Sequence, residues 1–316
     1  MPSEPTHKQP DATPLVSVIV PARNAERRLP RLLDALGSQT LDRDRYEVLV
    51  VDDASSDGTF EAIEASGVAT PIRLDEHGGP YVGRNAAAAA ARGRVLAFTD
   101  TDCDPVPDWL ERGVDALERL DADLVVGKID MLVDAEAPAV ALVDFIRNFD
   151  QESSAERGFG ATANLFVRRE TFDSSGGFNA ALMAGGDSEF GQRAVATGAR
   201  IAYADDCVVR HAARRRPRQL ARKAFRKGFG LAQRRRHADG VAPARVQPCS
   251  RPGYYVPHRH LAGFDRVRRS GLALRRSKVA AMHACSYLFF QLPLVAGNLA
   301  GTLSERVSLR AASRLR

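Results

Sequence analysis

Residues 95–105 read VLAFTDTDCDP, and this stretch decides the fold that we expect for the chain. Its opening run VLAF has the length and composition of a buried strand, which Pro105 is expected to end. Carboxylates follow at alternate positions, those of Asp100, Asp102 and Asp104. Carboxylates crowded in this way raise one another's pKa unless a cation lies among them. The pattern indicates either a site for a hard cation such as Mg²⁺ or Mn²⁺, or an acidic turn that caps the next helix.

Strands and helices alternate before this stretch. Apolar strands are expected at 15–20, 46–51 and 71–74, and helices are expected at 25–36 and 82–92. This alternation predicts βαβ units, and therefore an α/β fold with a mostly parallel sheet flanked by helices. Ligands of such sheets bind outside the carboxyl ends of the strands.

Polar side chains follow three of the expected strands. Arg23 and Asn24 come after the first strand, and Asp52 and Asp53 come after the second. The acidic cluster follows the strand that begins at Val95. Because the carboxyl ends of parallel strands share one edge of a sheet, we expect these groups to face a common site.

Together these motifs resemble the inverting family 2 glycosyltransferases of the GT-A fold. The segments that carry the resemblance are, in chain order, 16–24, 51–59, 83–85, the acidic strand end, 185–190, Arg193 and His211. The resemblance covers residues 15–215 and implies a Rossmann-like GT-A domain. It also implies an enzyme, a glycosyltransferase of the hexosyltransferase type, that moves a sugar from a nucleotide diphosphate sugar to a hydroxyl group of an acceptor.

The resemblance assigns a donor site to the first half of the chain. Asp53 matches the carboxylate that accepts hydrogen bonds from the base. Asp52 would contact the nucleotide or hold its loop through backbone amides. Arg84, at the start of a helix, is placed to meet an anion. The residues expected to bind the nucleotide sugar are Pro21, Arg23, Asn24, Asp52, Asp53, Arg84, Asp100 and Asn164.

The resemblance also implies a divalent metal, Mg²⁺ or Mn²⁺. Asp102 matches the family's principal metal ligand, and Asp100 would help by contacting the metal or the ribose. His211 follows the expected strand at 207–210 and would complete the metal site or contact the diphosphate. A lone histidine in this position could equally be structural.

Asp187 matches the family's catalytic base, the carboxylate that removes the proton from the acceptor hydroxyl. Where the family commonly has Glu, this chain has Gly186, so the usual pair of carboxylates is absent. Because Asp is a favoured N-cap, Asp187 could instead, or in addition, cap the helix expected at 188–197.

Charge divides the chain into two halves. Residues 1–209 hold 20 Lys and Arg against 36 Asp and Glu, a net charge of −16, whereas residues 210–316 hold 25 against 3, a net charge of +22. Such asymmetry favours an anionic partner for the basic half, either a membrane surface or nucleic acid. The basic half could also lie on the acidic one. No nucleic-acid recognition motif stands out, so an anionic membrane surface is the expected partner.

Two other functions stay open on the sequence. A nucleic-acid-binding protein could use the Arg-rich half. A nucleotidyltransferase would also need a metal and a nucleotide, but it would be expected to carry a Gly/Lys-rich first loop, which residues 21–24 lack.

The basic half is expected to be helical. Residues 217–238 alternate basic residues with an apolar stripe, which is typical of a membrane-surface helix or of a helix docked on the catalytic domain. The stripe consists of Leu220, Ala224, Phe225, Phe229 and Ala232. Residues 279–304 contain no charged residue and are long enough to cross a bilayer. Polar residues interrupt them, so we expect membrane association rather than a true span, on the cytoplasmic side because basic residues precede the segment.

These expectations divide the chain into three parts. A polar tail at 1–14 is expected to be disordered and shows no signal peptide. A GT-A domain follows at 15–215, and a basic, helical, membrane-associated extension follows at 216–316. The expected acceptor is a glycan or a lipid-linked molecule, and the expected role is the synthesis of cell-surface polysaccharide or glycolipid. No nucleic-acid partner is expected.

Overall fold

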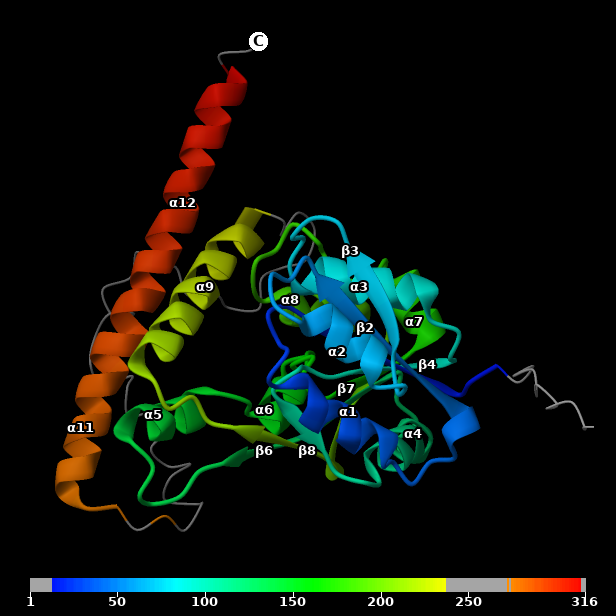
Figure 1. The fold of residues 1–316 in the computed structure, drawn as a ribbon. Coiled ribbons are helices and arrows are strands. Elements are labelled where there is room, and N and C mark those ends of the chain that lie inside the picture. Colours follow the sequence, from blue (N-terminus) through cyan, green and yellow to red (C-terminus); the bar gives the residue numbers. More distant parts are fainter. Residues whose placement is uncertain (1–12, 237–271, 273, 314–316) are drawn as a thin grey trace, which may run out of the picture.

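The computed structural model describes residues 13–236, 272 and 274–313 of the chain. Its centre is an eight-stranded sheet with helices on both faces (Figure 1). The strands are β1 (Val16–Ala22), β2 (Tyr46–Asp53), β3 (Thr70–Leu74), β4 (Val95–Phe98), β5 (Cys103–Pro105), β6 (Leu124–Leu132), β7 (Leu165–Arg168) and β8 (Ile201–Ala212). Their order across the sheet is β3-β2-β1-β4-β7-β6-β8-β5.

The first half of the sheet is parallel, as predicted. Strands β3, β2, β1 and β4 all run in one direction, so the polar ends of β1, β2 and β4 meet at one edge. The second half is mixed: β7 is antiparallel to β4 and β6, while β8 is parallel to β6. Strand β4 ends at Phe98, before the acidic cluster, and Pro105 is the last residue of the short strand β5 at the sheet's edge, where a strand tolerates the missing N–H.

Helices cover both faces and extend beyond the sheet. They are α1 (Leu29–Gly37), α2 (Thr59–Ala65), α3 (Pro80–Ala90), α4 (Trp109–Arg119), α5 (Ala139–Arg147), α6 (Gln151–Glu156), α7 (Arg169–Ser174), α8 (Gly186–Ala196), α9 (Pro217–Arg236), α11 (Arg276–Ser286) and α12 (Leu292–Ser313). A π-helical turn at Tyr287–Gln291 joins α11 to α12. The predicted helix at 217–238 is confirmed as far as Arg236, and its last two residues lie outside the described part.

Alternate residues of the central strands build two hydrophobic layers. Val18 and Ala97 point into one layer, which includes the buried faces of α1, α4 and α5. Ile19 and Phe98 point into the other, which includes the buried faces of α3, α7 and α8. Burial on both faces explains why these strands read as continuous apolar runs.

The basic extension shares the core of the catalytic domain. Leu220 and Ala224 of α9 are fully buried and belong to the layer that contains α1 and α4. Phe225, which the sequence placed in the same stripe, is 39% exposed. Helix α9 lies between the domain and a rod formed by α11 and α12 (Figure 1). The boundaries predicted at 15–215 and 216–316 stay predictions, and the tail at 1–14 falls almost wholly outside the described residues.

Glycines allow α9 and α12 to approach closely. A Cβ at Gly228 of α9 would overlap the carbonyl oxygen of Leu294, and a Cβ at Gly297 of α12 would overlap that of Phe225. Gly301 lies one turn beyond Gly297, on the same side of α12, and faces Phe229 and Ala232. The two backbones are therefore in direct contact.

We predict that Gly297→Ala destabilises the protein. Alanine favours a helix over glycine by about 1 kcal/mol, but forcing a methyl group into a packed contact costs typically about 1–3 kcal/mol. Ala296→Leu, which also adds apolar volume but on the exposed side of the same helix and with little change in helix propensity, is the control. Urea unfolding should show a loss for Gly297→Ala alone. A gain in stability for Gly297→Ala would contradict the close contact.

Candidate active site

Loops after β1 and β2 form one wall of the site. Asn24 adopts a left-handed conformation, with φ of 46°, which suits Asn better than most residues. Its Oδ1 accepts a hydrogen bond from the N–H of Ser56 (2.9 Å), and its own N–H donates to Oγ of Ser55 (2.9 Å). Arg23 is exposed beside this contact, and Pro21 lies at the end of β1. The structure therefore brings the predicted Arg23–Asn24 segment to the loop after β2.

Asp53 holds the loop that precedes α3. Its Oδ1 accepts from the N–H of Gly78 (2.7 Å), and its Oδ2 accepts from the N–H of Gly79 (3.0 Å). Oδ2 also lies 2.8 Å from Nδ1 of His77. The side chain is nearly fully buried. Contact between Asp53 and a base stays a prediction; in this arrangement both carboxylate oxygens are occupied by the loop.

Asp52 is buried with one oxygen uncommitted. Its Oδ1 accepts from the N–H of Ser55 (3.2 Å), which agrees with the alternative that Asp52 holds its loop. Its Oδ2 has no hydrogen-bond partner among the described residues, and Nε of Arg73 lies 3.8 Å away. An unpaired buried carboxylate oxygen is uncommon, because it loses its hydrogen bonds to water and gains none from the protein.

Helix α3 carries three consecutive residues with different tasks. Gly83 packs against Pro21 of β1, where a Cβ would make ordinary van der Waals contact. Arg84 is buried, and its Nη2 lies 2.5 Å from Oδ1 of Asp100. Asn85 exchanges two hydrogen bonds with the backbone of Phe178 (2.7 and 3.0 Å). Arg84 thus pairs with the predicted donor-site carboxylate, and Asn85 fixes the turn that leads to α8.

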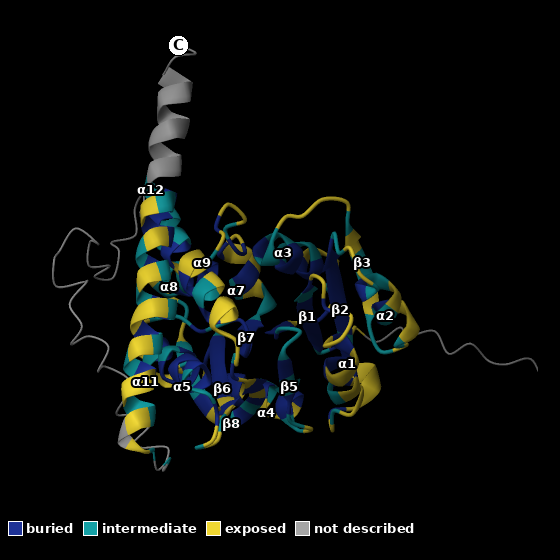
Figure 2. Cartoon of the chain, turned by 60° about the vertical axis from the view of Figure 1, so that its left-hand side comes forward, coloured by how far each residue is buried: buried dark blue, intermediate teal, exposed yellow. Residues whose placement is uncertain are grey.

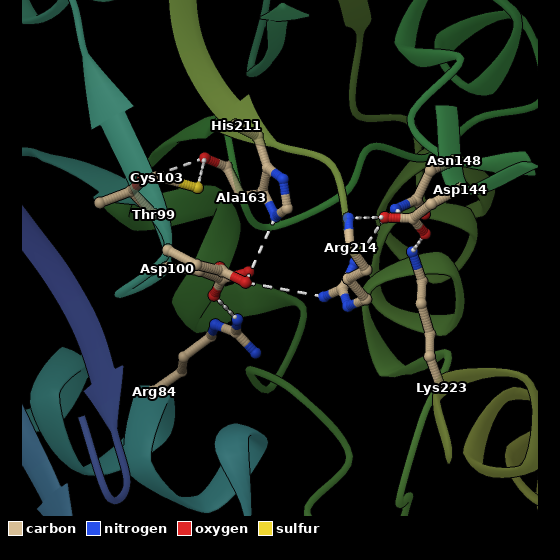
Figure 3. A network of polar contacts seen from close by, with 11 residues as sticks. Arg84, Thr99, Asp100, Cys103, Asp144, Asn148, Ala163, His211, Arg214 and Lys223 are labelled. Carbon is tan, nitrogen blue, oxygen red and sulfur yellow. Dashed lines mark hydrogen bonds and ion pairs between the residues drawn. The ribbon is translucent and has the colours of Figure 1, made fainter. Parts of the chain in front are cut away.

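Asp102 and His211 converge although they are far apart in the sequence. The antiparallel pairing of β5 with β8 sets Cys103 opposite His211, and this register brings the histidine to the acidic turn. Nε2 of His211 lies 3.4 Å from Oδ2 of Asp102, and Nη2 of Arg214 lies 3.6 Å from the same oxygen (Figure 3). Burial would raise the pKa of Asp102, but the hydrogen bond and charge of His211 and the charges of Arg214 and Arg28 lower it below its ordinary value.

Only two of the three predicted metal ligands lie close together. No three His, Cys, Asp or Glu side chains are grouped as metal ligands anywhere in the described chain. Asp100 pairs with Arg84, whereas Asp102 and His211 face each other. Because Mg²⁺ is usually held by one or two carboxylates, waters and substrate phosphates, the Asp102–His211 pair fits the protein's share of such a site. Nδ1 of His211 is buried with no hydrogen-bond partner among the described residues. The metal roles of all three residues stay predictions.

Asp187 lies in the first turn of α8, near Arg84. Gly185, with φ of 80°, is the N-cap, so Asp187 is not. Its Oδ1 accepts from the N–H of Ser188 (2.9 Å). Burial raises the pKa of Asp187, and the hydrogen bond from Ser188 and the charges of Arg84 and Lys227 oppose this rise without cancelling it. A carboxylate with a raised pKa is a better proton acceptor.

Tyr81 explains why glycine stands at position 186. A Cβ at Gly186 would lie 2.8 Å from the ring of Tyr81. The N–H of Gly186 donates to the Tyr81 hydroxyl (2.9 Å). A glutamate in this position would therefore displace Tyr81. The missing second carboxylate is a consequence of how α3 packs against α8.

Asn164 is the predicted site residue that the structure contradicts. It is completely buried, and its Oδ1 accepts from Nε1 of Trp109 (2.9 Å). Its Nδ2 donates to the carbonyl oxygens of Lys128 and Cys207 (2.9 Å each). With every polar atom of its side chain used inside the core, Asn164 cannot bind the donor. It instead joins β6, β7, β8 and α4 beneath the site.

Sequence reasoning missed a polar network next to Asp102. Arg214 also reaches Asp144 of α5, through its N–H (3.0 Å) and its Nη1 (3.3 Å). Lys223 of α9 donates to the other oxygen of Asp144 (3.2 Å), as does Asn148 (3.3 Å). Figure 3 shows the contacts of Asp144 with Arg214, Lys223 and Asn148. A lone Asp within the apolar stretch AVALVDFI at 139–146 was the available signal.

Solved glycosyltransferases share this fold. The mannosyltransferase PcManGT from Pyrobaculum calidifontis, in complex with GDP-Man and Mn²⁺, is 23% identical with a TM-score of 0.65, over 92% of this chain and 88% of that one. TarS 1–349 of S. aureus, in complex with UDP-GlcNAc, is 19% identical with a TM-score of 0.53, over 93% and 92% of the two chains. The GT-A fold predicted from the sequence is confirmed.

The sequence places the chain in a family. The model described as Glycosyl transferase family 2 matches residues 17–180. Glycosyltransferase AglE of Haloferax volcanii is 36% identical over 225 residues, which are 70% of this chain and 74% of that protein. The chain belongs to glycosyltransferase family 2, and it is a glycosyltransferase.

More distant relatives agree with this assignment. A pre-mycofactocin glycosyltransferase of Mycobacterium tuberculosis is 29% identical over 254 residues, but these are only 51% of that protein against 77% of this chain. Succinoglycan biosynthesis protein ExoO of Rhizobium meliloti is 31% identical over 209 residues, 61% of this chain and 59% of the relative. None of these relatives supports a nucleotidyltransferase or a nucleic-acid-binding protein.

We predict that Asn164→Asp acts on stability rather than on donor binding. The aspartate can still accept from Trp109 but cannot donate to the two carbonyl oxygens. Each buried group left unsatisfied costs about 1–3 kcal/mol, so denaturant unfolding should occur at a clearly lower urea concentration. The KM for the nucleotide sugar should stay unchanged in the folded fraction. A raised KM with unchanged stability would restore Asn164 to the donor site.

Proposed function

We propose that the protein transfers a sugar, with inversion, from a nucleotide diphosphate sugar to a hydroxyl group of a glycan or lipid-linked acceptor, in the synthesis of cell-surface polysaccharide or glycolipid. The observation that carries this proposal is the meeting of Asp102 with His211 and of Arg84 with Asp100 at the edge where β1, β2 and β4 end. The solved neighbours in complex with GDP-Man and UDP-GlcNAc support a nucleotide sugar as donor.

The donor would lie across the loops at this edge. The base and ribose would meet the loops that hold Arg23, Asn24 and Asp52, and the diphosphate would lie between Arg84 and Asp102. Arg84 is already paired with Asp100, which orients its guanidinium group and leaves its buried Nε without a partner among the described residues. A guanidinium group held in this way is suited to bidentate contact with phosphate oxygens.

A divalent cation, Mg²⁺ or Mn²⁺, would be held by Asp102 and His211 and would supply Lewis-acid stabilisation of the departing diphosphate. The low pKa of Asp102 keeps this carboxylate ionised at any physiological pH. Arg214, which lies 3.6 Å from Asp102, adds positive charge on the same side. The protein thus stabilises the leaving group with fixed charges.

Asp187 would act as the base. Its pKa is raised by burial, in contrast with that of Asp102. Two carboxylates whose environments move their pKa values apart are suited to different roles in one reaction. Asp187 would take the proton of the acceptor hydroxyl, and the freed oxygen would attack the sugar from the side opposite the diphosphate.

We predict that Asp102→Asn lowers turnover at least about 10²-fold, the usual effect of losing one group that stabilises the leaving charge. A thermal-shift assay with UDP or GDP and Mn²⁺ gives an independent reading. For the wild-type protein, a nucleotide at 100 times its Kd should add about 2.7 kcal/mol of stability, and the variant should lose the part that depends on Mn²⁺.

Asp104→Asn is the matched control, because Asp104 lies two positions away and pairs with the exposed Arg31. It should retain turnover and the Mn²⁺-dependent shift. Full activity of Asp102→Asn in buffer treated with a chelator would refute the proposed metal role.

We predict that Asp187→Asn lowers the rate by about 10²–10⁴-fold without weakening nucleotide binding. The wild-type rate should rise with pH through a pKa above the ordinary 3.8, and the variant's residual rate should lack this limb. The folded protein holds this proton more tightly than the unfolded chain, so stability falls as pH rises through the raised pKa. The variant should therefore be at least as stable as the wild type at neutral pH. Parallel losses of stability and nucleotide affinity would contradict the role as base.

We further propose that the rod of α11 and α12 rests on the cytoplasmic face of a membrane. Among the described residues, one helical run, 277–302, is long and apolar enough to cross a membrane by length and composition, and 22% of its most apolar window is buried. Leu288, Leu292 and Leu299 are about half exposed along the outward side, which Figure 2 shows in yellow. The other side packs on α5 and α9. A helix in this position is suited to an interfacial site.

We predict that replacing Leu288 and Leu292 together by Gln weakens flotation with anionic liposomes, because apolar area exposed to lipid is lost. Leu120→Gln, at the C-cap of α4, where the leucine is 36% exposed, is the control and should have no effect. Binding of the wild type should fall with salt. If liposome binding changes neither with the substitution nor with the charge of the lipid, the rod does not rest on the membrane. Truncation is not a suitable test, since α9 completes the core.

A further inference from the structure

A concentration of positive charge surrounds a pocket of about 720 Å³ beside Asp102. The pocket lies between the loop after β1, the end of β8 and the first three turns of α9. Of its eleven lining residues seven are cationic and only Asp102 is acidic. Positive charge focused in a concave surface attracts anions.

Most of this charge has no partner within the described chain. Of the seven cations, only Arg214 and Lys223 form ion pairs with described carboxylates. Arg28 donates to the carbonyl oxygen of Asn24, and Arg222 and Arg226 are exposed, one turn apart on the same side of α9. Like charges gathered in this way repel one another unless an anion joins them.

The inner wall of the pocket is rigidly held. Asp144 is buried, and its two oxygens hold Arg214 and Lys223 in place. One carboxylate serves both cations, so the inner wall keeps a net positive charge. Burial, together with the charge of Arg214, lowers the pKa of Lys223 to about 7. An anion in the pocket would reverse this effect and stabilise the charged lysine.

We propose that this pocket binds the phosphate or diphosphate group of a lipid-linked acceptor. This inference rests on the proposed function, because it assigns the acceptor to the region next to Asp102. One diphosphate, that of the donor, would neutralise the charge near Asp102 and Arg28 only. Arg222 and Arg226 extend the pocket along α9, which packs on α12. The hydrocarbon chain of the acceptor would continue from the pocket toward the apolar side of the α11–α12 rod.

The test measures the binding of two ligands to the full-length protein in detergent micelles. Farnesyl phosphate is the acceptor probe, farnesol is its neutral control, and UDP or GDP with Mn²⁺ is the donor probe. The variant Arg222→Gln/Arg226→Gln removes the two outer charges. Arg218→Gln is the matched control, because Arg218 is an exposed arginine of α9 that does not line the pocket.

We expect farnesyl phosphate, but not farnesol, to bind the wild type while saturating nucleotide is present. The double variant should weaken this binding at least about tenfold, or 1.4 kcal/mol, and leave the Kd of the nucleotide unchanged. Arg218→Gln should change neither value.

Three results would overturn the inference. If nucleotide displaces farnesyl phosphate and the double variant weakens both equally, the pocket belongs to the donor. If inorganic phosphate binds as tightly as farnesyl phosphate, the pocket is a small-anion site. If farnesyl phosphate fails to bind while nucleotide binds normally, the acceptor lies elsewhere. Failure of the nucleotide itself to bind the wild type would instead contradict the proposed function.

Discussion

The buried carboxylate of Asp144 holds the helical extension to the catalytic edge. It receives hydrogen bonds from Arg214, which follows β8, from Lys223 of α9, and from Asn148 at the end of its own helix. Burial raises the pKa of Asp144, but Lys223 and Arg214 outweigh it and keep the carboxylate ionised. Removing one partner of such a buried group costs about 3–5 kcal/mol, because the remaining charge is left uncompensated. The position of Arg214 beside Asp102 therefore depends on the docking of α9.

Helix α9 touches the site at both of its ends. Near its start, Lys223 supports Arg214 through Asp144. Near its end, Gln233 accepts from the N–H of Met183 (2.8 Å) and Arg234 donates to Gln192 (2.8 Å), so α9 also braces the loop that leads to Asp187. One helix thus supports both Arg214, on the side proposed to meet the departing diphosphate, and the loop before Asp187, the proposed base. This arrangement gives the basic half of the chain a structural role in addition to any contact with a membrane.

The sequence predicted the parts of the structure that depend on local pattern. Apolar runs followed by polar residues located β1, β2 and β4, and the parallel pairing of these strands then brought their ends together. Contacts between distant segments were harder to foresee. Asn164 was predicted to bind the donor, and its place in the core becomes clear only when Trp109 is seen to need an acceptor there. Gly186 reads like a lost catalytic residue until Tyr81 is seen against it. Asp144 could not be interpreted before β8 and α9 were placed beside α5.

The π-helical turn at Tyr287–Gln291 determines which side of the rod each partner meets. A π turn inserts one extra residue into a helix, and one residue corresponds to about 100° of rotation around the axis. Helix α11 rests on α5, and Nζ of Lys278 donates to the carbonyl oxygen of Ala135 in the segment before α5, while α12 presents Gly297 and Gly301 to α9. The turn sets the rotational phase between these two faces. Deleting one residue there would straighten the rod into a uniform helix, and the glycines would then face away from α9.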